Sequence, residues 1–343
     1  MCTSLTLSPP DCGRLFGRTL DLDTHFGEQV VLTGSRFPFG FRDAPAHRVR
    51  YALLGMAAVE DGYPLYAEAM NQAGLCMAGL RFAGNARYSE RYATGKINLA
   101  PWELIPYLLG RYATVGEVKN ALREIRVVGA DFSLRLPAAP LHWHIADSNP
   151  AHGELVVEVT ADGMRVYDNP VGVLTNNPPF PYQLIRYTEL ARLTPYPRAD
   201  REAFPTESIP LPADFSSMGE GSRGLPGDYS SASRFVRAAL LRRFVTEWLH
   251  SRRAGGEAAD DGVEVTPVAH LLRILSAVSP MAGAVLTPEG TAHRTLYTCC
   301  MDGSAGVYHY FTEEDRALRS VSFAGSDTDG EGLEVKSYES FMS

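Results

Sequence analysis

Short apolar runs bounded by turn-forming residues fill the first hundred residues, and they constrain the fold more than any other feature of the sequence. Each run has four to nine residues and is bounded by Gly, Pro, Asp or Asn, which is the pattern of β-strands joined by turns. Similar runs return in the middle of the chain and near its end. The predicted strands cover residues 3–7, 15–20, 29–32, 51–59, 74–82, 142–146, 155–160, 164–167, 172–175, 294–301, 306–311 and 318–323.

Four other segments have helical periodicity. The clearest has Thr266 as its N-cap and Pro267 as its first helical residue, followed by apolar residues every three or four positions. In another, Thr114 and Glu117 have the spacing of a capping box. Pro106 makes a third one irregular. The predicted helices cover residues 102–109, 114–125, 231–248 and 266–278.

The order of these elements predicts the fold class. Strands come first, helices follow, and both alternate again before strands finish the chain, which favours antiparallel sheet flanked by helices and hence an α+β fold. Residues 195–228 and 251–262 are rich in Gly and in Pro, Ser, Ala or Asp, and both are predicted to be loops. No repeat and no shift of composition marks a boundary, so residues 1–343 are expected to form a single domain.

Composition excludes several classes of protein. The 32 Lys and Arg against 40 Asp and Glu give a net charge of −8, whereas a nucleic-acid-binding domain is usually basic. The longest apolar runs, such as residues 51–59, fall far short of the ~18 residues of a membrane helix. The five cysteines are odd in number and form no C-x-x-C motif, so we expect neither a disulfide framework nor a zinc site. With no signal peptide, we expect a cytoplasmic protein without membrane or nucleic-acid partners.

Cys2 is the leading candidate for chemistry. Removal of Met1 would place a free α-amine on the same residue as the thiol. An α-amine titrates close to neutral pH, so it can act as the general base without a histidine. A thiol is the best side-chain nucleophile near neutrality. The alternative is an ordinary cysteine that happens to be second in the chain.

The segment Gly17-Arg18-Thr19-Leu20-Asp21 strengthens this hypothesis. In a strand, Arg18 is a cation that could stabilise the Cys2 thiolate, and Asp21 at the strand end could orient the α-amine. The alternative is that Arg18 and Asp21 form an ordinary ion pair at the surface.

These segments and several others resemble the choloylglycine hydrolase family, which includes conjugated bile salt hydrolases and penicillin V acylases. Their order and spacing match the family over nearly the full chain, although each one is weak alone. They comprise Met-Cys-Thr at residues 1–3, residues 17–21, Asn-Gln-Ala-Gly-Leu at 71–75, Ala-Gly-Leu at 78–80, Leu-His-Trp at 141–143, Gly-Val-Leu-Thr-Asn at 172–176, Gly-Leu-Pro-Gly-Asp at 224–228, Ser-Arg-Phe-Val-Arg at 233–237 and Thr-Leu-Tyr-Thr at 295–298.

The resemblance implies an N-terminal nucleophile hydrolase, with two antiparallel sheets between two layers of helices in a four-layer αββα sandwich. It implies that Cys2 is the nucleophile and, through its α-amine, the base. Arg18 and Asp21 would tune and orient Cys2, Asn176 would donate to the oxyanion, and Arg234 would support the nucleophile electrostatically. It also implies a homo-oligomer, often a tetramer, and a reaction that needs no metal or organic cofactor.

Arg81 departs from the family pattern, since many bile salt hydrolases have Asn and some penicillin V acylases have Tyr after the Ala-Gly-Leu motif. The resemblance implies that this residue gives a backbone N–H to the oxyanion hole, and a backbone donor survives substitution. The Arg81 side chain could pair with a carboxylate or sulfonate on the leaving group. Equally, it could point to solvent or pair with an acidic loop residue.

The remaining candidates are weaker. His142 and His144 lie two apart on one face of a predicted strand, and strand packing is favoured over a metal pair because no third ligand has suitable spacing. At least one of Cys299 and Cys300 is expected in the core, while Cys12 lies in a turn. The glycines at residues 221–227 lack the Lys-Ser/Thr of a phosphate-binding loop.

The predicted reaction is hydrolysis of a linear amide. Residues 1–5, 61–64 and 78–80 look closer to bile salt hydrolases, whereas residues 285–290 look closer to penicillin V acylases. Glycine- or taurine-conjugated bile acids are therefore placed ahead of phenoxyacetyl amides, and acyl-homoserine lactones come third. A non-catalytic binder of bile acids or lipids stays open, although the presence of all five site residues argues against it.

Overall fold

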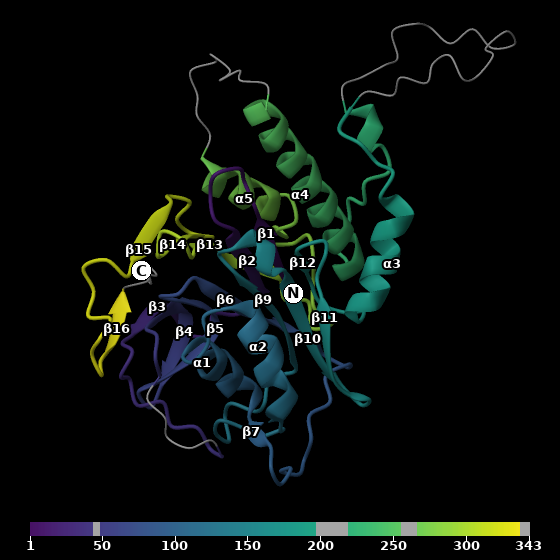
Figure 1. Cartoon of the computed structure of the whole chain (residues 1–343). Helices are drawn as coiled ribbons and strands as arrows, with labels where there is room; N and C mark the ends of the chain where they lie inside the picture. Colours follow the sequence, from purple (N-terminus) through teal and green to yellow (C-terminus); the bar gives the residue numbers. More distant parts are fainter. Residues whose placement is uncertain (44–48, 197–218, 255–265, 337–343) are drawn as a thin grey trace, which may run out of the picture.

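Two large antiparallel sheets form the centre of the computed structural model, which describes residues 1–43, 49–196, 219–254 and 266–336 (Figure 1). The six-stranded sheet has the order β12 (Val173–Leu174), β1 (Cys2–Leu7), β2 (Leu15–Leu22), β13 (Arg294–Asp302), β14 (Val307–Thr312), β15 (Arg319–Ser322). The eight-stranded sheet has the order β11 (Gly163–Asp168), β10 (Glu154–Thr160), β9 (Leu141–Asp147), β6 (Leu75–Arg81), β5 (Tyr63–Asn71), β4 (Leu53–Glu60), β3 (Glu28–Thr33), β16 (Leu333–Lys336). A short parallel pair, β7 (Ile97–Leu99) with β8 (Ile125–Val127), lies apart from both.

Helices cover the outer face of each sheet. On the six-stranded sheet, α4 (Ser231–Ala254) and α5 (Pro267–Ser276) pack against β1, and α3 (Phe180–Leu190) packs on α4. On the eight-stranded sheet, α1 (Leu104–Leu109) packs against β5 and β6, and α2 (Val115–Ala121) against β9 and β10. Figure 1 shows the resulting order of helices, sheet, sheet and helices. The predicted four-layer αββα sandwich of the α+β class is confirmed.

Alternation along the strands divides the core into two parts. In β6, Cys76, Ala78 and Leu80 join the core between the two sheets, which continues to α4 and α5. Leu75 and Met77 of the same strand face the other way and join the core under α1 and α2. Successive side chains of a strand point to opposite faces, so both faces of this sheet are buried. The prediction of a single domain is not tested by these contacts and stays a prediction.

The structure corrects several predicted boundaries. The helix expected over residues 114–125 keeps its capping box at Thr114 and Glu117 but ends at Ala121, because Ile125 begins β8. The helix expected to end at residue 248 continues to Ala254. The prediction of a loop over residues 251–262 is therefore wrong for residues 251–254. Residues 255–265, and residues 197–218 of the other predicted loop, lie outside the described residues.

Among the described residues, five helices and strands were not predicted. Strand β5 starts at Tyr63 beside Pro64, which breaks a strand-like pattern because proline lacks a backbone N–H. Helix α3 and the strands β7, β8 and β16 were also missed, since α3 is largely exposed and these three strands are very short. Within the described ranges, no helix has the length and apolar character needed to cross a membrane.

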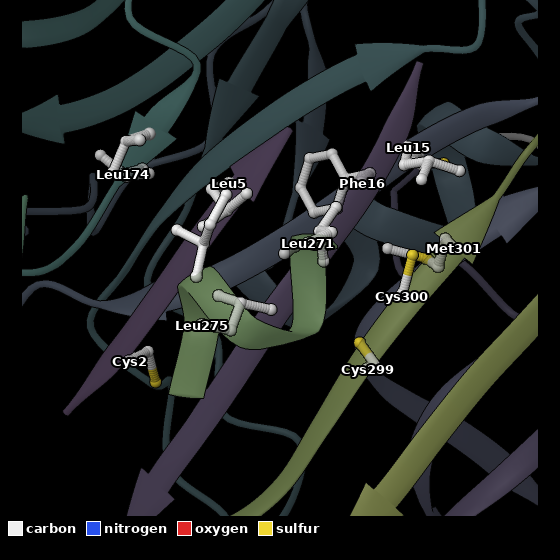
Figure 2. Close-up of a cluster of buried hydrophobic side chains, with 14 of the residues drawn as sticks. Cys2, Leu5, Leu15, Phe16, Leu174, Leu271, Leu275, Cys299, Cys300 and Met301 are labelled. Carbon is white, nitrogen blue, oxygen red and sulfur yellow. The ribbon is translucent and has the colours of Figure 1, made fainter. Parts of the chain in front are cut away.

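Gly17 of β2 lets α5 pack closely on the six-stranded sheet. A Cβ at this position would collide with the Cys299 carbonyl oxygen and with the side chains of Leu271 and Leu275. Figure 2 shows these two leucines of α5 lying over the strands of this sheet. Because a backbone carbonyl in a sheet cannot move aside, only glycine fits here.

Gly17→Ala should therefore lower the free energy of unfolding by about 1–3 kcal/mol, as expected when extra volume enters a packed core. Gly116→Ala is the matched control, because Gly116 lies exposed in α2 with open space around it. Alanine should raise stability there by up to about 1 kcal/mol. Urea unfolding followed by circular dichroism measures both, and equal effects at the two sites would contradict the close approach at Gly17.

Candidate active site

Cys2 opens strand β1, which lies between β12 and β2 in the six-stranded sheet. It pairs with Leu20 of β2, and its side chain is buried at the edge of the apolar cluster in Figure 2. Its backbone N–H donates to the Asn176 side-chain oxygen at 2.9 Å. The amino group of Met1 donates to the main-chain oxygen of Asp21 at 2.5 Å.

Arg18 lies fully buried between the two sheets. Its Nη1 donates to Glu68 at 3.0 Å and to the carbonyl oxygens of Ala67 and Gly79. Its Nη2 has no hydrogen-bond partner among the described residues. Burial opposes the charge on the guanidinium, but the negative charges that Cys2, Tyr297 and Glu68 can carry outweigh it and raise the pKa of Arg18. Arg18 therefore stays cationic beside the thiol.

Glu68 of β5 is the main site residue that sequence reasoning missed. It is fully buried and accepts hydrogen bonds from Arg18, from the hydroxyls of Tyr297 at 2.8 Å and Tyr308 at 2.6 Å, and from the Cys299 thiol at 3.6 Å. Burial, with the negative charge of Glu68 next to it, raises the pKa of Tyr297, whose hydroxyl remains a donor. A glutamate in a half-apolar segment has no sequence feature that distinguishes it from a solvent-exposed one.

Asp21 is also fully buried, close to the N-terminus. Its carboxylate accepts hydrogen bonds from the hydroxyls of Thr295 at 2.7 Å and Thr19 at 3.3 Å. The alternative of a surface ion pair between Arg18 and Asp21 is wrong, because both are buried and the ion pair of Arg18 is with Glu68.

Arg234 of α4 ties the N-terminal strand to Asn176. Its Nη1 donates to the Cys2 carbonyl at 2.6 Å and to the Thr3 hydroxyl at 2.7 Å, and its Nη2 donates to the Asn176 side-chain oxygen at 2.6 Å. Burial lowers the pKa of Arg234, against the opposing charges of Asp21 and Cys2. With its oxygen held by Arg234 and Cys2, the Asn176 amide must point its NH₂ group the other way.

That NH₂ group donates to the Arg81 carbonyl at 2.8 Å. Arg81 ends β6, and the next residue, Phe82, donates its N–H to Pro140 on the β9 side. Hydrogen-bonding directions alternate along an antiparallel strand, and one residue's N–H and C=O point to the same side. The Arg81 N–H therefore points away from β9, toward the side where Asn176 lies.

A pocket of about 570 Å³ opens over this cluster. The Arg81 side chain is exposed on it, and no ion pair or side-chain hydrogen bond of Arg81 occurs among the described residues. The predicted alternative of pairing with an acidic loop residue is therefore not seen there. The pocket is lined by Met1, Asp23, Arg81, Ala83, Asn176, Asn177, Ser231, Arg234, Leu286, Thr287, Pro288, Glu289 and His293.

The two strand histidines have structural partners. His142 contacts Glu158 at 3.2 Å and the Thr175 carbonyl at 2.9 Å. His144 contacts the Ser4 hydroxyl and Glu154, each at 3.0 Å. The predicted packing role is confirmed, and in the described part of the chain no three His, Cys, Asp or Glu side chains lie close enough to hold a metal. Cys299 and Cys300 are both buried, as expected for at least one, and Cys12 is exposed.

All six predicted site residues thus lie together around one pocket or directly beneath it. The structure adds Glu68, the threonines that hold Asp21, and Ser231, whose hydroxyl accepts the Asn176 N–H at 2.8 Å. These residues come from β1, β2, β5, β6, β13, α4 and the segment after β12.

Comparisons with known proteins agree with this geometry. The sequence model of the family described as linear amide C–N hydrolases, choloylglycine hydrolase family, matches residues 2–336. A bile salt hydrolase/transferase of Lactiplantibacillus plantarum is 39% identical over 94% of this chain and 92% of its own length. A conjugated bile acid hydrolase of Lactobacillus acidophilus is 34% identical over 93% of this chain and 95% of its own.

Solved structures agree as well. A crystal structure of a conjugated bile acid hydrolase from Clostridium perfringens has a TM-score of 0.83 and 29% identity, and covers 98% of this chain and 97% of that one. A penicillin V acylase from Agrobacterium tumefaciens has a TM-score of 0.71 at 18% identity, over 97% of this chain and 90% of that one. The second likeness concerns the fold alone.

The buried pair of Arg18 and Glu68 gives a prediction for stability. Arg18→Met or Glu68→Gln alone should each lower the free energy of unfolding by about 3–5 kcal/mol, because each leaves a buried charge without its partner. The double variant should lose clearly less than the sum, since no uncompensated charge remains. Urea unfolding of the two single variants and the double variant measures these losses of unfolding free energy. Strictly additive losses would show that the two charges do not stabilise each other.

Proposed function

The chain belongs to the choloylglycine hydrolase family of linear amide C–N hydrolases, and on that premise we propose that it deconjugates glycine- and taurine-conjugated bile salts, with Cys2 as the nucleophile. The observation that carries this proposal is the position of Cys2 at the head of β1, next to a buried cation and under an open pocket. Relatives 30–39% identical, each matched along nearly the full length of both chains, are bile salt or conjugated bile acid hydrolases.

The proposed mechanism begins with removal of Met1, which turns the Cys2 nitrogen from an amide into an amine. The amine can accept a proton, whereas the amide cannot. Two features support this role: the Cys2 nitrogen is held by the Asn176 side-chain oxygen, and the Asp21 carboxylate is buried close to the N-terminus. Arg18 stabilises the thiolate because it is a buried cation facing the thiol.

In the acylation step, the Cys2 sulfur attacks the amide carbonyl while the α-amine takes the thiol proton. The resulting oxyanion is stabilised by the Asn176 side-chain NH₂ and the Arg81 backbone N–H, which both lie on the side of β6 away from β9. The α-amine then gives its proton to the leaving nitrogen, the C–N bond breaks and a thioester remains. Water attacks the thioester, with the same α-amine as base, and releases the acid.

We propose that the Arg81 side chain binds the anionic group of the leaving amine. Its side chain lies exposed on the pocket wall without a partner among the described residues, and glycine and taurine both carry an anion where a guanidinium could bind it. Leu286 and Pro288 supply an apolar part of the same pocket, which suits a steroid or another large acyl group.

The five cysteines are all free in the structure, which supports our proposal that the protein works in the reducing cytoplasm. We also propose a homo-oligomer, on the basis of the family resemblance. Sedimentation of the purified protein would settle its oligomeric state.

The direct test measures amine release from glycocholate, taurocholate, penicillin V and an acyl-homoserine lactone in parallel. We expect release from the two bile salts to be fastest. Faster cleavage of penicillin V would make the chain a penicillin V acylase, and no cleavage of any amide would favour a non-catalytic binder.

Cys2→Ser should abolish turnover and keep the circular dichroism spectrum, because a hydroxyl is a far weaker nucleophile near neutral pH. Mass spectrometry should find that active protein lacks Met1. Substantial turnover by the serine variant, or full activity in protein that retains Met1, would contradict the mechanism.

Arg81→Ala should raise KM for glycocholate about tenfold with little change in kcat, since an exposed ion pair is lost and the backbone donor is kept. Added salt should have the same effect on the unmodified enzyme. Arg91→Ala is the control, because Arg91 is exposed outside the pocket. An equal rise in KM for an amide with a neutral leaving group would show that Arg81 does not bind the anion.

A further inference from the structure

The amino group of Met1 lies in a position that is informative about the reaction. Because Met1 and Cys2 are consecutive, bond lengths and angles keep their nitrogens no more than about 3.7 Å apart, so this group lies next to the Cys2 nitrogen. A proton passed on by the Cys2 α-amine must arrive at about this distance. In the structure, the Met1 amino group donates a hydrogen bond to the main-chain oxygen of Asp21, at 2.5 Å.

His293 borders the same position. It lines the pocket together with Met1 and Arg81, and the positive charge of the amino terminus acts on its ring. Its backbone N–H donates to the Val285 carbonyl at 2.9 Å, which fixes the residue at the base of the loop that carries Leu286. Its Nδ1 is buried and has no partner among the described residues. The ring is therefore not committed through Nδ1 to another described residue, while the residue itself borders the pocket.

The charges around His293 decide whether its ring can accept a hydrogen bond. Burial lowers the pKa of His293, and the amino terminus and Arg81 lower it further, while Asp23 and Asp21 oppose them. Glu289 also lines the pocket. Because the net shift is downward, the imidazole is neutral near pH 7 and one ring nitrogen is an acceptor.

We infer that His293 and the main-chain oxygen of Asp21 form the receiving site for the leaving nitrogen of the amide, with His293 accepting its N–H. This inference rests on the proposed function of the same pocket. It makes His293 a catalytic residue that no motif in the sequence had indicated.

The proton balance of the reaction is unchanged. The thiol proton moves to the Cys2 α-amine and then to the leaving nitrogen, and the C–N bond breaks as the thioester forms. His293 gains and loses no proton. By accepting the N–H of the amide, it turns the lone pair of that nitrogen toward the α-ammonium that must protonate it.

Two substrates with the same acyl group test this assignment: cholylglycine and the p-nitrophenyl ester of cholic acid. Both acylate Cys2, but the nitrophenolate leaves without being protonated and has no N–H to donate. His293→Leu should lower kcat/KM for the amide about tenfold more than for the ester, the value of one hydrogen bond made in the transition state. His293→Gln should restore most of the loss, because its side-chain oxygen can accept the same N–H.

His270→Leu is the matched control, since His270 is likewise partly buried but packs on Trp248, outside the pocket. Partial misfolding would lower both rates alike and leave the ratio of amide to ester cleavage unchanged. His293→Phe repeats the test with a second side chain that cannot accept a hydrogen bond. An unchanged ratio in both variants would overturn the role of His293 while amide cleavage by the unmodified enzyme still stood. Ester cleavage without any amide cleavage by the unmodified enzyme would instead overturn the proposed function.

Discussion

The ion pair between Arg18 and Glu68 connects the two sheets, and the rest of the site is arranged around it. The pairing of β5 with β6 ends at Glu68 and Ala78. At the next position, the carbonyl oxygens of Ala67 in β5 and Gly79 in β6 both accept hydrogen bonds from Arg18. They accept these bonds in place of bonds from the N–H groups of the neighbouring strand. The guanidinium of one sheet therefore replaces ladder bonds of the other. Because Gly79 lies two residues before Arg81, the same contact also fixes the strand end that faces Asn176.

Charge balance explains why this cluster can be buried. Two guanidinium groups, Arg18 and Arg234, and two carboxylates, Glu68 and Asp21, are all inaccessible to solvent. Each isolated charge would cost several kcal/mol in such surroundings, but each has several hydrogen-bond partners. The tyrosine hydroxyls on Glu68 and the threonine hydroxyls on Asp21 serve this purpose. Cys2 therefore lies in a fixed field whose nearest cations are held in place before any substrate arrives.

Sequence reasoning could predict the layers and most of the site, for different reasons. Period-two alternation gave most strands, and the capping residues Thr114 and Thr266 gave two helix starts. The site residues came from the family resemblance, since spacing alone left Cys2 and Arg18 open to ordinary interpretations. Glu68 and His293 could not be predicted, because their place in the site depends on partners more than two hundred residues away in the chain. These partners are Tyr297 and Tyr308 for Glu68, and the N-terminus for His293. Long-range contacts of this kind leave no periodic trace.

The hydrogen bond from the Cys2 nitrogen to Asn176 has a consequence for maturation. An amide N–H and an amine N–H can both donate to the same side-chain oxygen, so loss of Met1 need not move the nitrogen that Asn176 holds. Arg234 holds the other side of the residue through the Cys2 carbonyl, which trimming leaves intact. Removal of Met1 would therefore change the chemistry of the nitrogen and not its place. An amide nitrogen cannot accept the thiol proton and an amine can, and the same cut frees the position beside Asp21 and His293 for the leaving group.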